Sequence, residues 1–350
     1  MKNQRLTPLA TFLLLFNMAA TAHSLPSPDA EINSTTIPTL TGCGPSSTIN
    51  QLFSQFGSSG KMPAELGRWL NDTKAQTVKP YQAFDNVYYV GICWVSAWLI
   101  KTSEGPVLID TLYGEFTDQL IENIKKIGVD PAEIKMVLLT HGHFDHVGGV
   151  SKLKALTNAR FVMSEEGWKE AQLDAKNTQG KPNAWTIPAP AATDILVKDG
   201  SALTIGDTTF HAYMTPGHTW GTTSYVLDVK EGNNTYRAIT IGGLGLNAID
   251  SPQQVEAYIR SIDRIKAMVE DTKRPITVHL TAHPFSNGQI EVQNQLKVRQ
   301  PGQAHPMVDA KGLLEQLATL RASAVERLVV EQAQIKSKRP DEVHWINEDL

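Results

Sequence analysis

Short apolar runs bounded by turn-forming residues recur through most of the chain and predict β-strands. We expect strands at 87–90, 95–101, 106–110, 135–139, 161–163, 195–197, 208–214, 224–229, 237–241 and 276–280. Apolar residues at helical spacing predict helices, because positions three and four apart share one helix face. These helices are expected at 64–70, 115–127, 150–156, 165–172, 251–270 and 311–334. Strands in both halves, with helices interspersed, indicate an α/β protein in which two sheets face each other and helices cover them outside.

The beginning of the chain has the features of a targeting signal. Lys2 and Arg5 precede a mostly apolar run that ends at Ala20, and Ala20-Thr21-Ala22 offers an A-x-A cleavage site. The apolar run is short for a membrane span, so an uncleaved anchor is the less favoured alternative. We therefore predict a signal peptide at 1–22 and a protein that is exported, to the periplasm or beyond, with no membrane attachment after cleavage.

The remaining chain divides by composition. Residues 23–60 are rich in Ser, Thr, Pro and Gly, and with a short helix at 64–70 they predict a loose N-terminal leader at 23–77. One compact domain is expected at 78–335, and a polar tail at 336–350. A long irregular loop at 177–192 is of the kind that often covers a site.

The composition and net charge indicate which kinds of binding partner are expected. The 350 residues are 41% hydrophobic and 19% charged, as is ordinary for a soluble globular protein. A net charge of −4 without a basic run gives no support for nucleic-acid binding. The partner that we expect is a small-molecule substrate. The two cysteines, Cys43 and Cys93, allow either one disulfide or a buried thiol at Cys93, and neither has metal-ligand spacing.

The chemistry concentrates directly after the strand expected at 135–139. His141, His143, Asp145 and His146 place three imidazoles and one carboxylate within six positions. These are groups that zinc accepts, and a loop at a strand end can aim several of them at one point. A histidine-rich surface loop is the alternative, but the density of ligand types favours a metal site.

Two later loops repeat this placement of a histidine after a strand. His218 follows the run at 208–214, and His283 follows the run at 276–280. Catalytic zinc generally takes three protein ligands and leaves one position for water. Two such sets can be formed, and we predict the first to be His141, His143 and His218 and the second to be Asp145, His146 and His283. His279 lies inside an apolar run and is expected to be structural.

The motifs resemble those of one family. H-x-H-x-D-H at 141–146, P-G-H-T at 216–219 and A-H-P at 282–284 are similar, in order and spacing, to the ligand motifs of the metallo-β-lactamase superfamily. The pattern is most similar to class B zinc β-lactamases with a His₃ and an Asp-His₂ metal site. The resemblance implies a four-layer αββα sandwich with two metal ions at one edge of the two sheets.

The sequence differs from the subfamilies of that superfamily at two points. Glyoxalase-II-like and lactonase-like members carry a metal-bridging Asp after a strand that corresponds to 237–241, and no acid follows this strand directly here. The similar β-lactamases carry serines in the same region that hold the substrate carboxylate, and this chain has Leu244 and Leu246 there. The first departure disfavours the lactonase-like members, and the second argues against a β-lactam substrate.

These observations predict a zinc-dependent hydrolase in which a metal-bound hydroxide opens an amide or cyclic amide. Asp145 is the expected catalytic residue, because it can orient the nucleophile and pass a proton to the leaving group. Asp110 is a candidate partner for a ligand histidine. The expected cofactor is two Zn²⁺, with iron or manganese also compatible with these ligands. The alternatives are a lactonase or other ester hydrolase, and a non-catalytic exported metal-binding protein. The tryptophans at 94, 98, 185 and 220 are candidates for a pocket wall or for ordinary packing.

Overall fold

The computed structural model describes residues 40, 42–59, 61–249 and 251–337. The predicted signal peptide, positions 23–39, 41 and 60 of the leader and positions 338–350 of the tail lie outside these residues. The strands are β1 (Tyr81–Phe84), β2 (Val87–Tyr89), β3 (Trp98–Ile100), β4 (Val107–Ile109), β5 (Met136–Leu138), β6 (Arg160–Ser164), β7 (Ile195–Val197), β8 (Ala202–Ile205), β9 (Thr208–Met214), β10 (Thr223–Glu231), β11 (Asn234–Thr240) and β12 (Ile276–His279). The helices are α1 (Ser46–Ser59), α2 (Ala64–Asn71), α3 (Gly114–Lys126), α4 (Phe144–Val147), α5 (Val150–Leu156), α6 (Glu165–Thr178), α7 (Pro252–Val269), α8 (Gln289–Val298) and α9 (Ala310–Ser337), with short 3₁₀ turns η1 (Pro131–Glu133) and η2 (Pro284–Ser286).

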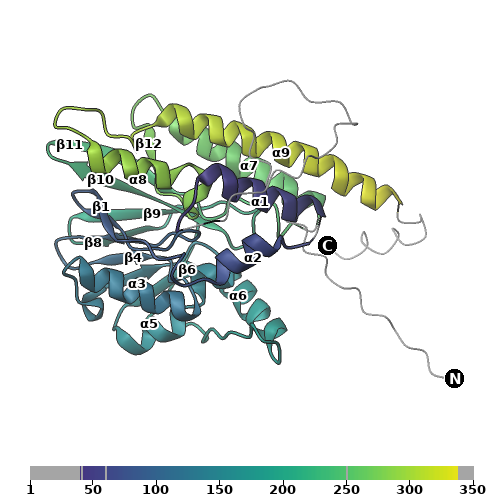
Figure 1. The fold of residues 1–350 in the computed structure, drawn as a ribbon, viewed down its shortest axis with the longest axis horizontal. Coiled ribbons are helices and arrows are strands. Elements are labelled where there is room, and N and C mark those ends of the chain that lie inside the picture. The colour runs from purple at the N-terminus through teal and green to yellow at the C-terminus, as the bar shows by residue number, and fades with distance from the viewer. Residues whose placement is uncertain (1–39, 41, 60, 250, 338–350) are drawn as a thin grey trace.

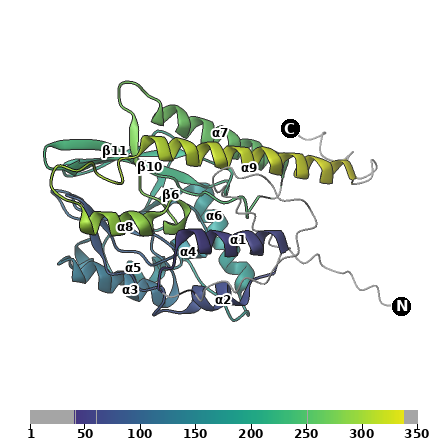
Figure 2. The same cartoon turned by 45° about the horizontal axis from the view of Figure 1, so that its top comes forward.

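The strands form two sheets that face each other (Figure 1). One sheet has the order β1-β2-β3-β4-β5-β6-β7, antiparallel up to β4 and parallel from β4 onward. The other has the order β12-β11-β10-β9-β8. Helices α3 and α5 lie beyond the first sheet, and α7 and α9 lie beyond the second (Figures 1 and 2). The predicted αββα sandwich is therefore confirmed.

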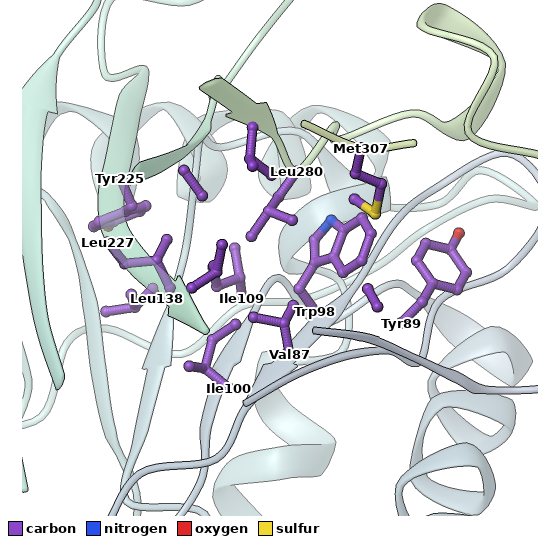
Figure 3. Packing of buried hydrophobic residues seen from close by; sticks show 14 of the residues in the cluster. Val87, Tyr89, Trp98, Ile100, Ile109, Leu138, Tyr225, Leu227, Leu280 and Met307 are labelled. Atoms are coloured by element: carbon purple, nitrogen blue, oxygen red, sulfur yellow. The ribbon is translucent and has the colours of Figure 1, made fainter. Parts of the chain in front are cut away.

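The alternation of side chains along each strand explains the layering. On β4, Val107 and Ile109 are buried between the sheets, while Leu108 packs with the helices outside. On β10, Tyr225 and Leu227 point into the same interior and Val226 joins the cluster under α7 and α9. Figure 3 shows this interior, to which both sheets contribute. Each sheet is thus apolar on both faces, as a four-layer sandwich requires.

The segment before residue 78 differs from the loose leader that we expected. From Ser46 the chain forms α1, whose buried Ile49, Leu52, Phe53 and Phe56 recur at helical spacing and join the interior cluster. A Cys43–Cys93 disulfide ties this segment to the connection between β2 and β3, which resolves the two alternatives left open for the cysteines. The Ser- and Gly-rich composition did not predict this helix, because packing of its apolar face, rather than helix propensity, stabilises it.

Other differences are local. Helix α6 runs to Thr178, beyond the predicted end at residue 172, and β3 is shorter than its apolar run. The loop that follows α6 is held against it, because Trp185 Nε1 donates to Asp174 at 3.1 Å and Trp168 Nε1 donates to the Pro188 carbonyl at 3.0 Å. In the described part of the chain, no helix combines the length and apolar character needed to cross a membrane.

Candidate metal centre

Six side chains from three segments of the chain meet at one edge of the sandwich. The segment after β5 supplies His141 and His143, and the single turn α4 supplies Asp145 and His146. His218 comes from the β9–β10 loop and His283 from the loop after β12, so the second sheet contributes one residue to each set. The structure gathers them into the two groups expected from the sequence, and within each group the ligand atoms lie within 4.8 Å of one another.

The first group has the geometry of a metal-binding triad. His218 Nε2 lies 3.1 Å from His141 Nε2 and 3.1 Å from His143 Nδ1, and those two atoms are 3.1 Å apart. A tetrahedral ion with bonds of about 2 Å places its ligand atoms roughly 3.3 Å apart. The three nitrogens therefore already stand at nearly the spacing that one shared ion imposes.

Hydrogen bonds at the far side of two rings fix which nitrogen carries the proton. His218 Nδ1 donates to the Gly245 carbonyl at 2.7 Å, which leaves a lone pair on Nε2. Thr140 Oγ1 donates to Asp110 at 2.9 Å and so accepts from His141 Nδ1 at 3.1 Å. His141 consequently also presents a lone pair at Nε2. Both rings are oriented as ligands rather than as donors.

In the second group, too, hydrogen bonds at Nδ1 orient the two histidine rings. His146 Nδ1 donates to Asp110 Oδ2 at 2.8 Å, and His283 Nδ1 donates to the Trp94 carbonyl at 2.7 Å. The opposite nitrogens approach Asp145 Oδ2, at 3.1 Å for His146 and 3.8 Å for His283. His146 Nε2 is buried, and the Asp145 carboxylate is its polar neighbour at 3.1 Å, without the geometry of a full hydrogen bond. A cation between these groups would satisfy the nitrogen and the carboxylate together.

Burial and charge favour a cation at this centre. Burial lowers the pKa of His143 to about 3 and the pKa values of His218 and His283 to about 4, so these rings are neutral near pH 7 and able to ligate. Burial also lowers the pKa of His146, but Asp145 and Asp110 together raise it above the ordinary value. Burial raises the pKa of Asp145, but His146 and His283 hold it well below the usual range. A positive charge beside the carboxylates of Asp145 and Asp110 is therefore stabilising, and a bound ion would supply one.

Asp110 supports both groups, as its position at the end of β4 suggested. It accepts from the Thr140 amide at 2.9 Å, from the Thr140 hydroxyl and from His146. Its φ of 61° lies in the left-handed region, which few residue types adopt without strain. The contacts to Thr140 and His146 compensate for that backbone conformation and link it to the site.

Replacing Asp110 with asparagine is expected to weaken metal binding about 10- to 100-fold, as is typical when the carboxylate behind a ligand histidine is lost. The amide can present its NH₂ group to His146 Nδ1, which disfavours the tautomer that ligates through Nε2. Competition with a chromogenic chelator would measure the affinity. An unchanged affinity in a folded Asp110→Asn protein would contradict this role.

Several positioning contacts were not predictable from the sequence. Glu170 on α6 accepts the amides of Trp220 at 2.7 Å and Gly221 at 2.9 Å, which anchors the His218 loop. A Cβ at Gly243 would lie 2.3 Å from the ring of His218, so only glycine leaves room for this ligand. These residues lie far from the histidines in sequence, and no local pattern marks them.

The four tryptophans have different environments. Trp98 is buried in the interior, and Trp185 is half-buried beside α6. Trp220 is 46% exposed in the His218 loop. Trp94 stacks on His283 with ring centroids 5.5 Å apart. The packing alternative therefore holds for Trp98, whereas Trp94 borders the centre directly.

Comparison with known proteins agrees with this geometry. Residues 90–233 match the family model of the metallo-β-lactamase superfamily. The subclass B3 metallo-β-lactamase of Bradyrhizobium japonicum is 29% identical, with a TM-score of 0.64 over 74% of this chain and 97% of that one. The metallo-β-lactamase from Legionella gormanii shares the fold, with a TM-score of 0.65 at 24% identity over 73% of this chain and 98% of that one.

Among curated sequences, a probable polyketide biosynthesis zinc-dependent hydrolase of Bacillus subtilis is 30% identical over 148 residues, which are 42% of this chain and 57% of that protein. The chain thus spans less than two thirds of this relative. The shared fold and the two residue groups at one edge of the sandwich together support a divalent metal site. On these findings residues 90–233 match the metallo-β-lactamase superfamily, and the solved structural neighbours of the chain include subclass B3 metallo-β-lactamases.

Proposed function

We propose that this protein is an exported metal-dependent hydrolase that holds two zinc ions and opens an amide or cyclic amide bond in a small molecule. The observation that carries the proposal is the pair of adjacent three-residue groups, in each of which the ligand atoms lie within 4.8 Å of one another. The rings of His141 and His146 lie 4.2 Å apart between centroids, so the two groups form one centre. The similarity to metallo-β-lactamases and to a zinc-dependent hydrolase supports the same assignment.

Bound divalent cations would supply the chemistry of activating a water molecule and polarising a substrate carbonyl. The contribution of the chain is orientation and charge. His218 and His141 are held in one tautomer by Gly245 and Thr140. Asp145 is kept ionised, with His146 and His283 beside it, so its carboxylate can accept a hydrogen bond from the attacking water and orient it.

An ester or lactone hydrolase is the second candidate. The segment after β11 carries Leu244 and Leu246, which are 3% and 4% exposed and pack in the cluster under α7 and α9. Their side chains offer no hydrogen bond to a substrate carboxylate, which favours an uncharged cyclic ester over a β-lactam acid. A third possibility is a non-catalytic exported protein that only binds metal.

A single set of assays separates these functions. Protein purified without added ions is analysed for bound metal, and then a chromogenic cephalosporin, simple amides and lactones are offered to metal-loaded and chelated samples. We expect metal-dependent hydrolysis of at least one class, with the preferred class identifying the bond. Bound metal without turnover of any amide or ester would favour the non-catalytic alternative. Absence of both would overturn the proposal.

A further inference from the structure

The connection between β2 and β3 lies against one of the two ligand groups. The Trp94 carbonyl accepts the Nδ1 proton of His283 at 2.7 Å, and the indole stacks on the same imidazole with an interplanar angle of 25°. Two residues further on, the Ser96 amide donates a hydrogen bond to the carbonyl of Ala282, the residue before His283, at 2.9 Å. One short segment therefore sets both the ring plane and the proton position of His283.

This segment is itself held from outside. Cys93, directly before Trp94, is bonded to Cys43 in the stretch that leads into α1. The Cys93 amide also donates to the Gln76 carbonyl at 3.0 Å, and Trp94 Nε1 donates to Tyr113 Oη at 3.2 Å. The disulfide thus connects the N-terminal helices to the residue that orients His283.

The other ligand group relies on different supports. His218 is oriented by the Gly245 carbonyl, and His141 is oriented by the Thr140 hydroxyl. Both of these partners are distant in sequence from the disulfide and from Trp94. A change at Cys93 therefore acts on His283 directly, and it reaches the His141–His143–His218 group only at longer range, through Tyr113 and Phe144 and through global stability.

We propose that the Cys43–Cys93 disulfide, acting through Trp94, positions His283 and so sets the affinity of the second metal position separately from that of the first. The proposal rests on the metal binding assumed in the proposed function. A ligand ring whose partner carbonyl is fixed loses little freedom when it binds an ion, whereas a loosened carbonyl leaves the ring to be ordered at binding. Trp94 is a positioning residue in this scheme and touches no reacting atom.

The test is a cobalt(II) titration of the metal-free protein followed by visible absorbance, which reports the two positions by their different ligand sets. In the Cys43→Ser/Cys93→Ser variant we expect the affinity of the Asp145–His146–His283 position to fall about 10- to 100-fold, the usual effect of losing an outer-shell support. The affinity of the other position should be unchanged. Trp94→Ala should act in the same direction with the disulfide intact, and Trp94→Phe should restore most of the affinity because it keeps a stacking ring.

Reduction of the folded wild-type protein gives an independent reading that needs no substitution. A trialkylphosphine reduces the disulfide to two thiols and becomes the phosphine oxide, with water supplying the oxygen and the two thiol protons. Removal of the phosphine under anaerobic conditions before the titration prevents competition for metal. The reduced protein should reproduce the selective loss seen in the double serine variant.

Ile265→Ala is the matched control for stability. Ile265 is buried on α7 in the cluster under α9, away from Trp94, and its truncation lowers the stability of the fold without touching His283. It should leave the ratio of the two affinities at the wild-type value. Equal affinities in oxidised and reduced protein, or a parallel fall at both positions as in a general destabilisation, would overturn the proposal. A wild-type protein that binds no cobalt would instead overturn the proposed function.

Discussion

His218→Ala is expected to lower kcat/KM for the substrate that the assays identify by at least about 10³-fold, since losing an ion that polarises the reacting group removes several kcal/mol of transition-state stabilisation. His218 is the one member of its group that the second sheet supplies, and its Nε2 stands 3.1 Å from the ligand atoms of both His141 and His143. Removing it leaves two nitrogens, too few to hold the first ion firmly. Metal content per chain should fall by about one equivalent, and steady-state kinetics with mass-spectrometric metal analysis would measure both effects.

His211→Ala provides the control for that experiment. His211 lies on β9, the strand that leads into the His218 loop, but belongs to neither ligand group. Its replacement should leave metal content and kcat/KM near wild-type values. If the His218→Ala protein kept full metal content and nearly full activity, the first metal position would have to be built from other residues.

The two groups of candidate metal-binding residues could be predicted because each member follows a strand, at a position where apolar residues give way to polar ones. A contiguous motif after β5 defines four of them, and His218 and His283 each follow an apolar strand of the other sheet. Two sheets packed face to face bring such strand ends to one edge, which converts positions in sequence into neighbours in space. Asp110 was accessible by the same argument, since it ends β4 beside β5.

The supports of these ligands were not accessible in this way. Gly245 orients His218 through its carbonyl group, and Glu170 holds the His218 loop through two amides. A backbone carbonyl has no signature in the side-chain pattern, and a glutamate on an amphipathic helix resembles any solvated residue until the fold places it. Gly243 could be seen as a flexible position, but its actual role is to leave space for an imidazole.

The fold was predictable where apolar runs were long and uninterrupted. The paired sheets followed from such runs, whereas the edge strand β8 was missed because it is only four residues long and mostly solvent-accessible. Helix α1 was missed because its apolar positions are diluted by Ser, Gln and Gly, and its stability comes from packing on the interior and from the Cys43–Cys93 link. Such a helix depends on tertiary contacts that propensity does not report.

The interior between the sheets packs directly against the edge that carries the site. Trp98 is 1% exposed there, and its ring meets Tyr89 edge-on with centroids 5.0 Å apart (Figure 3). Its Nε1 donates to the Thr281 carbonyl at 3.0 Å, two residues before His283. The same side chain therefore fills the core and ties β3 to the loop of a ligand.

Trp98→Ala is expected to lower the free energy of unfolding by about 3–5 kcal/mol, because it opens a large cavity in a well-packed core. The effect should fall toward the upper end, since a buried carbonyl that loses its donor costs a further ~1–3 kcal/mol. Urea unfolding of the metal-free, oxidised protein by circular dichroism would measure the change. Trp98→Phe keeps an aromatic ring but not the donor, so its loss should be clearly smaller. A loss below about 1 kcal/mol for Trp98→Ala would be that of an ordinary surface change and would contradict the packing described between the two sheets.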